Sequence, residues 1–177
     1  MQQISISNIE NYLIIRRYYL LYLKLQQKYC IFGSKLQNLS LMKKSKQQKF
    51  ATVINCMDGR TQLPVSKWVI KNYQIDYPDA ITEAGPVKII AENTDKKTIE
   101  SIKYRVAISV NKHKSKHLFL VAHYDCAGNP EAKSKQLKQL KKAVKNIRKW
   151  DYKVNEITGL WVGKNWKVKA YYTIKNT

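Results

Sequence analysis

The chain has 177 residues, 44% of them hydrophobic, which is enough for one globular domain with a substantial core. Its formal net charge of +21 is extreme, but the lysines cluster on predicted helices as a solvated face, so we do not expect nucleic acid as the main partner. Three cysteines do not make a disulfide framework and fit a reducing compartment, which favours a cytoplasmic protein.

Residues 1–41 differ in character from the rest of the chain. Residues 12–23 have the pattern of a basic amphipathic helix, but two adjacent arginines interrupt it, so we expect no stable membrane insertion. Few acidic and several basic residues are typical of a transit peptide, which would indicate an organelle, although serine is sparse. Because the first predicted strand closely follows Met42, we favour residues 1–41 as a basic arm or a mis-assigned extension, and residues 42–177 as the functional domain.

From residue 50 onward, predicted strands and helices alternate. Short apolar runs predict strands at 50–55, 79–84 and 118–122 and a terminal hairpin of strands 156–162 and 168–174. Apolar residues at helical spacing predict three helices, beginning at Pro64, after a Thr94 cap, and after an Asn129 cap. This alternation predicts a three-layer α/β domain with a mainly parallel sheet of about four to five strands.

Sulfur and imidazole side chains follow two of these strands. Cys56 comes directly after the first strand, and His123 and Cys126 come directly after the third. Neighbouring parallel strands end at the same edge of a sheet, so these loops can meet there. Two thiolates and one imidazole, with a fourth position left over, are the ligand count of a catalytic zinc site. The simpler interpretation is that each cysteine is only a small buried residue, because a lone His-x-x-Cys spacing is a weak signal.

Asp58 and Arg60 lie two and four residues after Cys56. A carboxylate paired with a guanidinium stays ionised and is held in a fixed orientation by paired hydrogen bonds. A surface salt bridge is the alternative interpretation of this pair. The position of both residues beside a candidate metal ligand favours a role in the site.

The two motifs together resemble the signature of the β-class carbonic anhydrases. They are C-x-D-x-R at residues 56–60 and H-x-x-C-A-G at residues 123–128, and the resemblance covers about residues 50–150. The sequence departs from the usual pattern at Gly59, where the family has serine, and at Ala127, where the family has glycine. The chain is also short for the class, so it resembles a small, divergent member.

The resemblance implies a zinc enzyme that hydrates CO₂ to bicarbonate by a metal-bound hydroxide. The ligands of Zn²⁺ would be Cys56, His123 and Cys126. Asp58 and Arg60 would be the catalytic dyad, and in some members the aspartate also binds zinc as a fourth ligand and closes the site. Two thiolates make zinc a weaker Lewis acid than three imidazoles would, so we expect the rate to rise toward alkaline pH. Members of the class are homodimers or higher homo-oligomers.

The residues that usually shape the CO₂ pocket are not located by these motifs. Two alternatives therefore stay open beside CO₂ hydration. One is a zinc hydrolase of a related small substrate, such as COS or CS₂. The other is a non-catalytic zinc-binding protein on the same scaffold.

Overall fold

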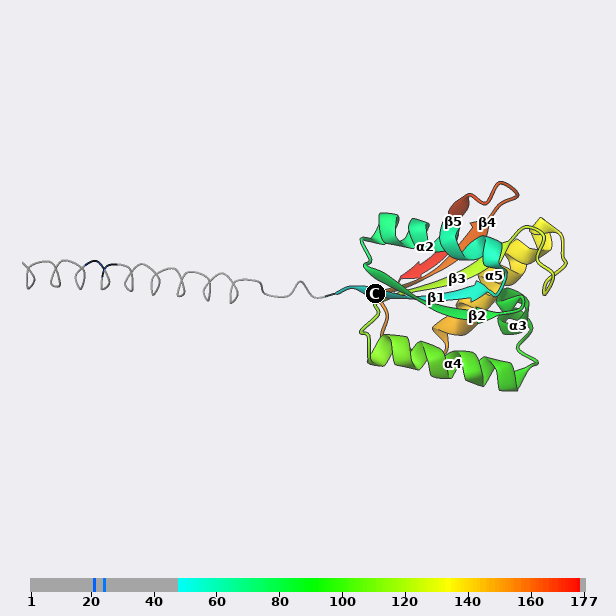
Figure 1. Cartoon of the computed structure of the whole chain (residues 1–177). Helices are drawn as coiled ribbons and strands as arrows, with labels where there is room; N and C mark the ends of the chain where they lie inside the picture. Colours follow the sequence, from blue (N-terminus) through cyan, green and yellow to red (C-terminus); the bar gives the residue numbers. More distant parts are fainter. Residues whose placement is uncertain (1–20, 22–23, 25–47, 176–177) are drawn as a thin grey trace, which may run out of the picture. The chain divides into compact units, whose positions relative to one another are not determined.

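The computed structural model describes residue 21, residue 24 and residues 48–175 (Figure 1). Apart from residues 21 and 24, the predicted N-terminal arm lies outside the described residues, as does the predicted start at Met42. The division at residue 42 therefore stays a prediction.

Five strands form one sheet in the described part of the chain, in the order β2-β1-β3-β4-β5. Their bounds are β1 Phe50–Cys56, β2 Tyr77–Glu83, β3 His117–His123, β4 Glu156–Val162 and β5 Val168–Lys175. Strands β2, β1, β3 and β4 are mutually parallel, and β5 pairs antiparallel with β4. The predicted mainly parallel sheet and the predicted terminal hairpin are both confirmed.

Helices cover both faces of the sheet (Figure 1). The described helices are α2 Gly59–Tyr73, α3 Pro86–Glu92, α4 Lys96–Asn111 and α5 Lys133–Arg148. On one face, Val65 and Val69 of α2 join a buried cluster with alternate residues of β1, β3 and β4. On the other face, α3, α4 and α5 pack on the intervening residues of the strands. The predicted three-layer α/β architecture is confirmed, and the central strands are apolar throughout because both of their faces are buried.

All three predicted helix starts differ from those in the structure. Helix α2 begins at Gly59 rather than at Pro64, because the Asp58 carboxylate accepts a hydrogen bond from the backbone N–H of Arg60 at 3.0 Å and caps the helix earlier. Pro64 lies inside the helix, where it removes one backbone donor. Helix α4 also begins one residue later than expected, with Asp95 as its cap.

Helix α5 begins at Lys133 rather than after an Asn129 cap. The Asn129 side chain is buried and donates instead to Gln139 Oε1 at 2.9 Å, while its backbone N–H closes a turn on the carbonyl of Cys126 at 3.0 Å. Asn129 therefore belongs to the loop that follows β3. The short helix α3 was not predicted, because a seven-residue apolar segment between turn residues has no decisive periodicity.

Two glycines bring the loop after β2 against the loop after β3. Gly85 has a φ of +63°, and a Cβ built on it would lie 2.4 Å from the carbonyl oxygen of Gly128. A Cβ on Gly128 would in turn lie 2.5 Å from the carbonyl carbon of Ala84. Only residues without a side chain allow this approach.

We expect Gly85→Ala to destabilise the domain by more than about 2 kcal/mol, because alanine is disfavoured at positive φ and its Cβ would clash with backbone atoms. This corresponds to a fall of at least about 4 °C in the thermal unfolding midpoint. The matched control is Gly59→Ala, because nothing lies within 4 Å of a Cβ at Gly59. Equal unfolding midpoints for the two variants would contradict the close approach.

Candidate metal centre

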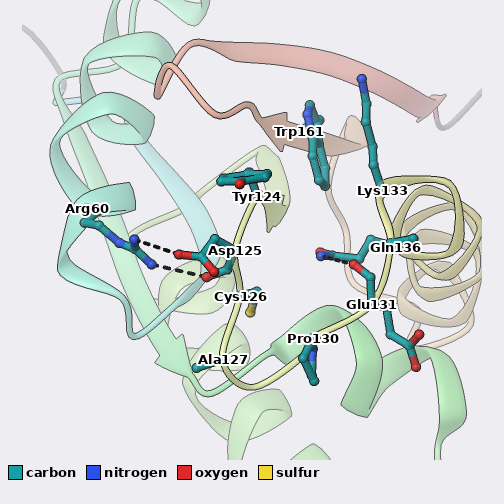
Figure 2. A pocket seen from close by; sticks show the side chains of 11 residues that line it. Arg60, Tyr124, Asp125, Cys126, Ala127, Pro130, Glu131, Lys133, Gln136 and Trp161 are labelled. Atoms are coloured by element: carbon teal, nitrogen blue, oxygen red, sulfur yellow. Dashed lines mark hydrogen bonds and ion pairs between the residues drawn. The ribbon is translucent and has the colours of Figure 1, made fainter.

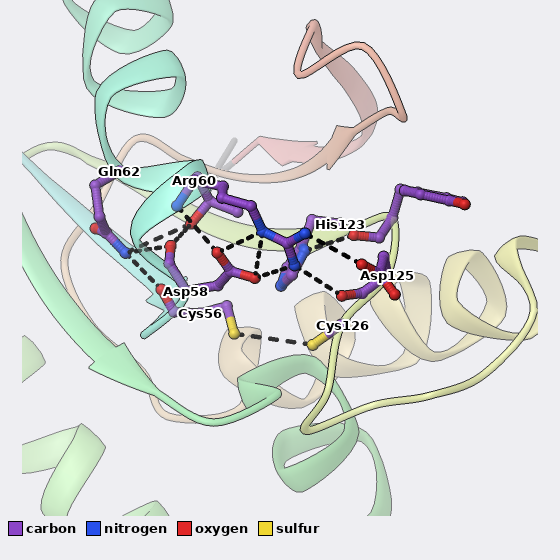
Figure 3. Close-up of polar contacts among 9 residues, drawn as sticks. Cys56, Asp58, Arg60, Gln62, His123, Asp125 and Cys126 are labelled. Atoms are coloured by element: carbon purple, nitrogen blue, oxygen red, sulfur yellow. Dashed lines mark hydrogen bonds and ion pairs between the residues drawn. The ribbon is translucent and has the colours of Figure 1, made fainter.

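The three predicted metal ligands meet at the carboxyl ends of two neighbouring strands. Cys56 is the last residue of β1, His123 is the last residue of β3, and Cys126 lies three residues further on (Figure 3). All three are buried, and their possible ligand atoms lie within 4.8 Å of one another. Strand adjacency therefore brings together residues that are far apart in the sequence.

The spacing of these atoms fits a tetrahedral thiolate metal site. The sulfurs of Cys56 and Cys126 are 3.8 Å apart, far longer than the bond of about 2.05 Å in a disulfide. Two sulfurs that each lie about 2.3 Å from one tetrahedral zinc ion are separated by about 3.8 Å. The two cysteines thus have the separation that a shared zinc ion requires.

One ring nitrogen of His123 is hydrogen-bonded, and the other has no hydrogen-bond partner. Its Nδ1 lies 2.8 Å from the backbone oxygen of Tyr124, and since that oxygen can only accept, Nδ1 carries the proton. Its Nε2 is buried and has no hydrogen-bond partner. A buried imidazole nitrogen with a lone pair and no donor beside it suits a metal ligand, and a backbone acceptor on the other nitrogen is the usual way to orient such a ligand.

The pKa values of the three side chains also favour binding of a cation by the cluster. The pKa of Cys56 lies well below that of an ordinary thiol, first because Cys126 donates a hydrogen bond to its sulfur. The same contact, with burial, raises the pKa of Cys126. Burial lowers the pKa of His123, but the nearby Cys56 sulfur and the hydrogen bond to the Tyr124 backbone oxygen outweigh it and leave the pKa raised. One thiolate thus forms readily, and stabilising a second one requires a positive charge.

Asp58 and Arg60 form an ion pair beside the cluster (Figure 3). Arg60 Nε lies 3.0 and 3.1 Å from the two carboxylate oxygens of Asp58, and Nη2 lies 2.6 Å from Oδ2. The pKa of Asp58 is lowered from 3.8 to about 2, first by the hydrogen bonds of the Arg60 side chain, which burial opposes, and next by the Arg60 backbone N–H. The carboxylate is therefore ionised at neutral pH and acts only as a hydrogen-bond acceptor.

Sequence reasoning missed two residues that contact Arg60. Asp125, inside the loop between His123 and Cys126, accepts from Arg60 Nη1 at 3.1 Å through its carboxylate. Trp166, in the turn between β4 and β5, has its ring centroid 4.7 Å from the Arg60 guanidinium carbon. An acidic residue within the ligand loop was a signal for the first contact, but nothing local in the sequence indicates the second.

A cavity of about 540 Å³ lies beside the cluster (Figure 2). Its lining includes Cys126, Arg60, Trp161 and Lys133. The ammonium of Lys133 lies 5.7 Å from the Trp161 ring centroid. The cavity gives a small molecule access to the Cys126 side of the cluster.

The family described as "Putative carbonic anhydrase" matches residues 46–171, which is well over half of the chain. This chain belongs to that family. The family predicted from the two motifs is thus confirmed. The structure adds a Cys-His-Cys cluster that can hold a metal ion. None of the curated proteins matches the chain.

Solved structures of β-carbonic anhydrases are similar to this carbonic anhydrase family member. Isoform I from Trichomonas vaginalis has 16% sequence identity and a TM-score of 0.46, over 81% of this chain and 96% of its own. A tetrameric enzyme from Sordaria macrospora has 11% identity and a TM-score of 0.46, over 88% of this chain and 99% of its own. The assignment to the family depends on the family match over residues 46–171 and not on these structural likenesses.

None of the helices in the described part of the chain has the length and apolarity that a membrane span requires.

Proposed function

We propose that this protein hydrates CO₂ to bicarbonate with a zinc ion held by Cys56, His123 and Cys126. The observation that carries the proposal is the convergence of two buried thiols and a partnerless imidazole nitrogen beside a carboxylate held by a guanidinium. When bound, zinc supplies hydroxide near neutral pH by lowering the pKa of water to roughly 7.

The ligand residues set the charge and orientation of the metal site. Two thiolates balance the two positive charges of the ion, which leaves the buried centre close to neutral once the imidazole is added. The carbonyl of Tyr124 holds the His123 ring so that Nε2 faces the two sulfurs. A fourth position is left for water, which a structural zinc site with four protein ligands would not leave.

Asp58 orients the water that attacks CO₂. Its ionised carboxylate accepts a hydrogen bond from the water and aims a lone pair of the oxygen at the carbon of the substrate. Arg60 keeps the carboxylate in place through contacts to both of its oxygens. In a closed form of the site, Asp58 would be the fourth residue that holds zinc.

We expect the rate of CO₂ hydration to rise toward alkaline pH without any contribution from titration of Asp58. A carboxylate with a depressed pKa stabilises the fold above its unfolded pKa of about 3.8, and this stability is lost as the pH falls through about 2. Between about pH 5 and pH 9, the charge on Asp58 is therefore constant. The measurement is a stopped-flow pH–rate profile, and a profile flat over this interval would count against the proposed mechanism.

Stopped-flow hydration of CO₂ by the zinc-loaded protein tests the proposal directly. Activity that is absent before zinc loading and present after it supports a carbonic anhydrase. Hydrolysis of COS or CS₂ without CO₂ hydration would move the substrate to those related molecules. Bound zinc with no turnover of any of the three would leave a non-catalytic zinc protein.

The family also supports a homodimer or higher homo-oligomer as the working state. Two sheet edges, β2 and β5, are left unpaired among the described residues. Light scattering on the eluting protein measures its mass in solution, and a monomer at micromolar concentration would remove this part of the proposal.

A further inference from the structure

We propose that Asp125 and Trp166 are positioning residues that hold Arg60 in the orientation the Asp58 carboxylate requires. This inference rests on the function proposed above. It adds two side chains to the dyad, one from the loop that carries two metal ligands and one from the turn between β4 and β5.

Arg60 divides its donors between two loops (Figure 3). Its Nε and Nη2 bind the carboxylate of Asp58, in the loop after β1. Its Nη1 donates to Asp125 Oδ2 at 3.1 Å, and its Nη2 also donates to the Asp125 backbone oxygen at 3.2 Å, in the loop after β3. One planar guanidinium therefore ties the loop of Cys56 to the loop of His123 and Cys126.

The backbone of Asp125 is shaped for this contact. Its φ is +57°, a left-handed conformation that only glycine, asparagine and aspartate adopt readily. In that conformation its carbonyl oxygen and its carboxylate both face Arg60 (Figure 2). Asp125 thus offers Arg60 two acceptors from an uncommon backbone conformation, which favours a structural role over an incidental surface ion pair.

Trp166 supports the guanidinium on its face. The ring packs against the buried cluster formed by α2, β1, β3 and β4, so the ring itself is held in place. Its backbone N–H donates to the Gly163 carbonyl at 2.9 Å, which fixes the turn. An arginine over an indole ring gains a cation–π interaction and loses the freedom to rotate toward that side.

These contacts matter because Arg60 is otherwise a long, exposed side chain. Its side chain is 47% exposed, and a single ion pair in such a setting holds a flexible group only weakly. Three supports from separate segments restrict the guanidinium to one orientation. The orientation of Asp58 then follows from that of Arg60.

Asp125→Asn and Asp125→Gly test the proposal without changing the backbone, because both residues tolerate positive φ. In the zinc-loaded protein, we expect each variant to retain its zinc and its KM and to lose about three- to five-fold in kcat, the range expected for an exposed ion pair. The matched control is Asp151→Asn. Asp151 is also exposed and has a φ of +58°, but it lies in the segment after α5, so its kcat should equal that of the unmodified protein.

Trp166 is tested by retaining or removing the aromatic face. We expect kcat to fall in the order unmodified protein, Trp166→Phe, Trp166→Leu, because phenylalanine keeps a weaker cation–π contact and leucine keeps none. In an Arg60→Gln background, Asp125→Asn should cause no further loss, because the residue it positions is gone. Full additivity of the two substitutions would overturn the proposal.

A readout independent of catalysis is the ¹⁵N NMR signal of Arg60 Nε, assigned by its loss in Arg60→Lys. Its proton should exchange slowly in the unmodified protein and at least about three-fold faster in Asp125→Asn. If the unmodified protein does not hydrate CO₂ but the Arg60 signal responds as expected, the proposed function fails and the positioning role stands. An unchanged exchange rate and an unchanged kcat in Asp125→Asn would overturn the positioning role.

Discussion

Replacing Cys126 with serine is expected to remove zinc from the protein. A serine hydroxyl stays protonated at neutral pH and is a poor ligand, so the site keeps one thiolate and one imidazole and loses its charge balance. The loss of zinc affinity should exceed the roughly 10- to 100-fold that substitutions of supporting residues around a metal cause. The CO₂ hydration rate should fall with the zinc content.

Metal analysis after dialysis against a weak chelator measures this effect. Cys56→Ser should behave in the same way, because its sulfur lies 3.8 Å from that of Cys126. Cys30→Ser is the matched control, since Cys30 is the one remaining cysteine of the chain and lies outside the predicted ligand set. One equivalent of tightly held zinc in Cys126→Ser would show that the protein binds zinc at another place.

Replacing Asp58 with asparagine is expected to lower kcat by about 100- to 1,000-fold while the zinc stays bound. The amide has the same shape as the carboxylate, but it is neutral and no longer holds Arg60 by charge. Its NH₂ group also presents donors where the attacking water needs an acceptor. Asparagine is as good a helix cap as aspartate, so α2 should keep its start and the fold its stability.

Kinetics and metal content measured on the same sample separate the role of Asp58 in catalysis from its role as a helix cap. Asp95→Asn is the control, because Asp95 caps α4 in the same manner, accepting from the Thr98 backbone N–H at 3.0 Å. That variant should keep full activity. If Asp58→Asn were as active as Asp95→Asn, Asp58 would be a cap only, and the proposed dyad would be wrong.

The sheet could be predicted from the sequence because its three central strands, β1, β3 and β4, are buried on both faces. An apolar run such as residues 118–122 is stable only when both of its faces are buried, as they are between two layers of helices. The alternation of such runs with amphipathic helices is compatible with few topologies. The meeting of Cys56 with His123 and Cys126 follows from the same logic, since both segments end parallel neighbouring strands. The helix starts were less predictable. Asp58, Thr94 and Asn129 can each cap a helix, but of these three only Asp58 does so in the structure, and the local sequence does not distinguish them.

The sequence by itself determined the layered α/β architecture, the family and the residues able to hold a metal, because these follow from periodic burial and from ligand chemistry at strand ends. Only the tertiary structure decided what surrounds those residues. The contact of Gly85 with Gly128 and the contacts of Arg60 with Asp125 and Trp166 join segments more than 40 residues apart. Such contacts depend on how loops close over the sheet edge, which is decided by packing between distant segments and leaves no periodic trace in the chain.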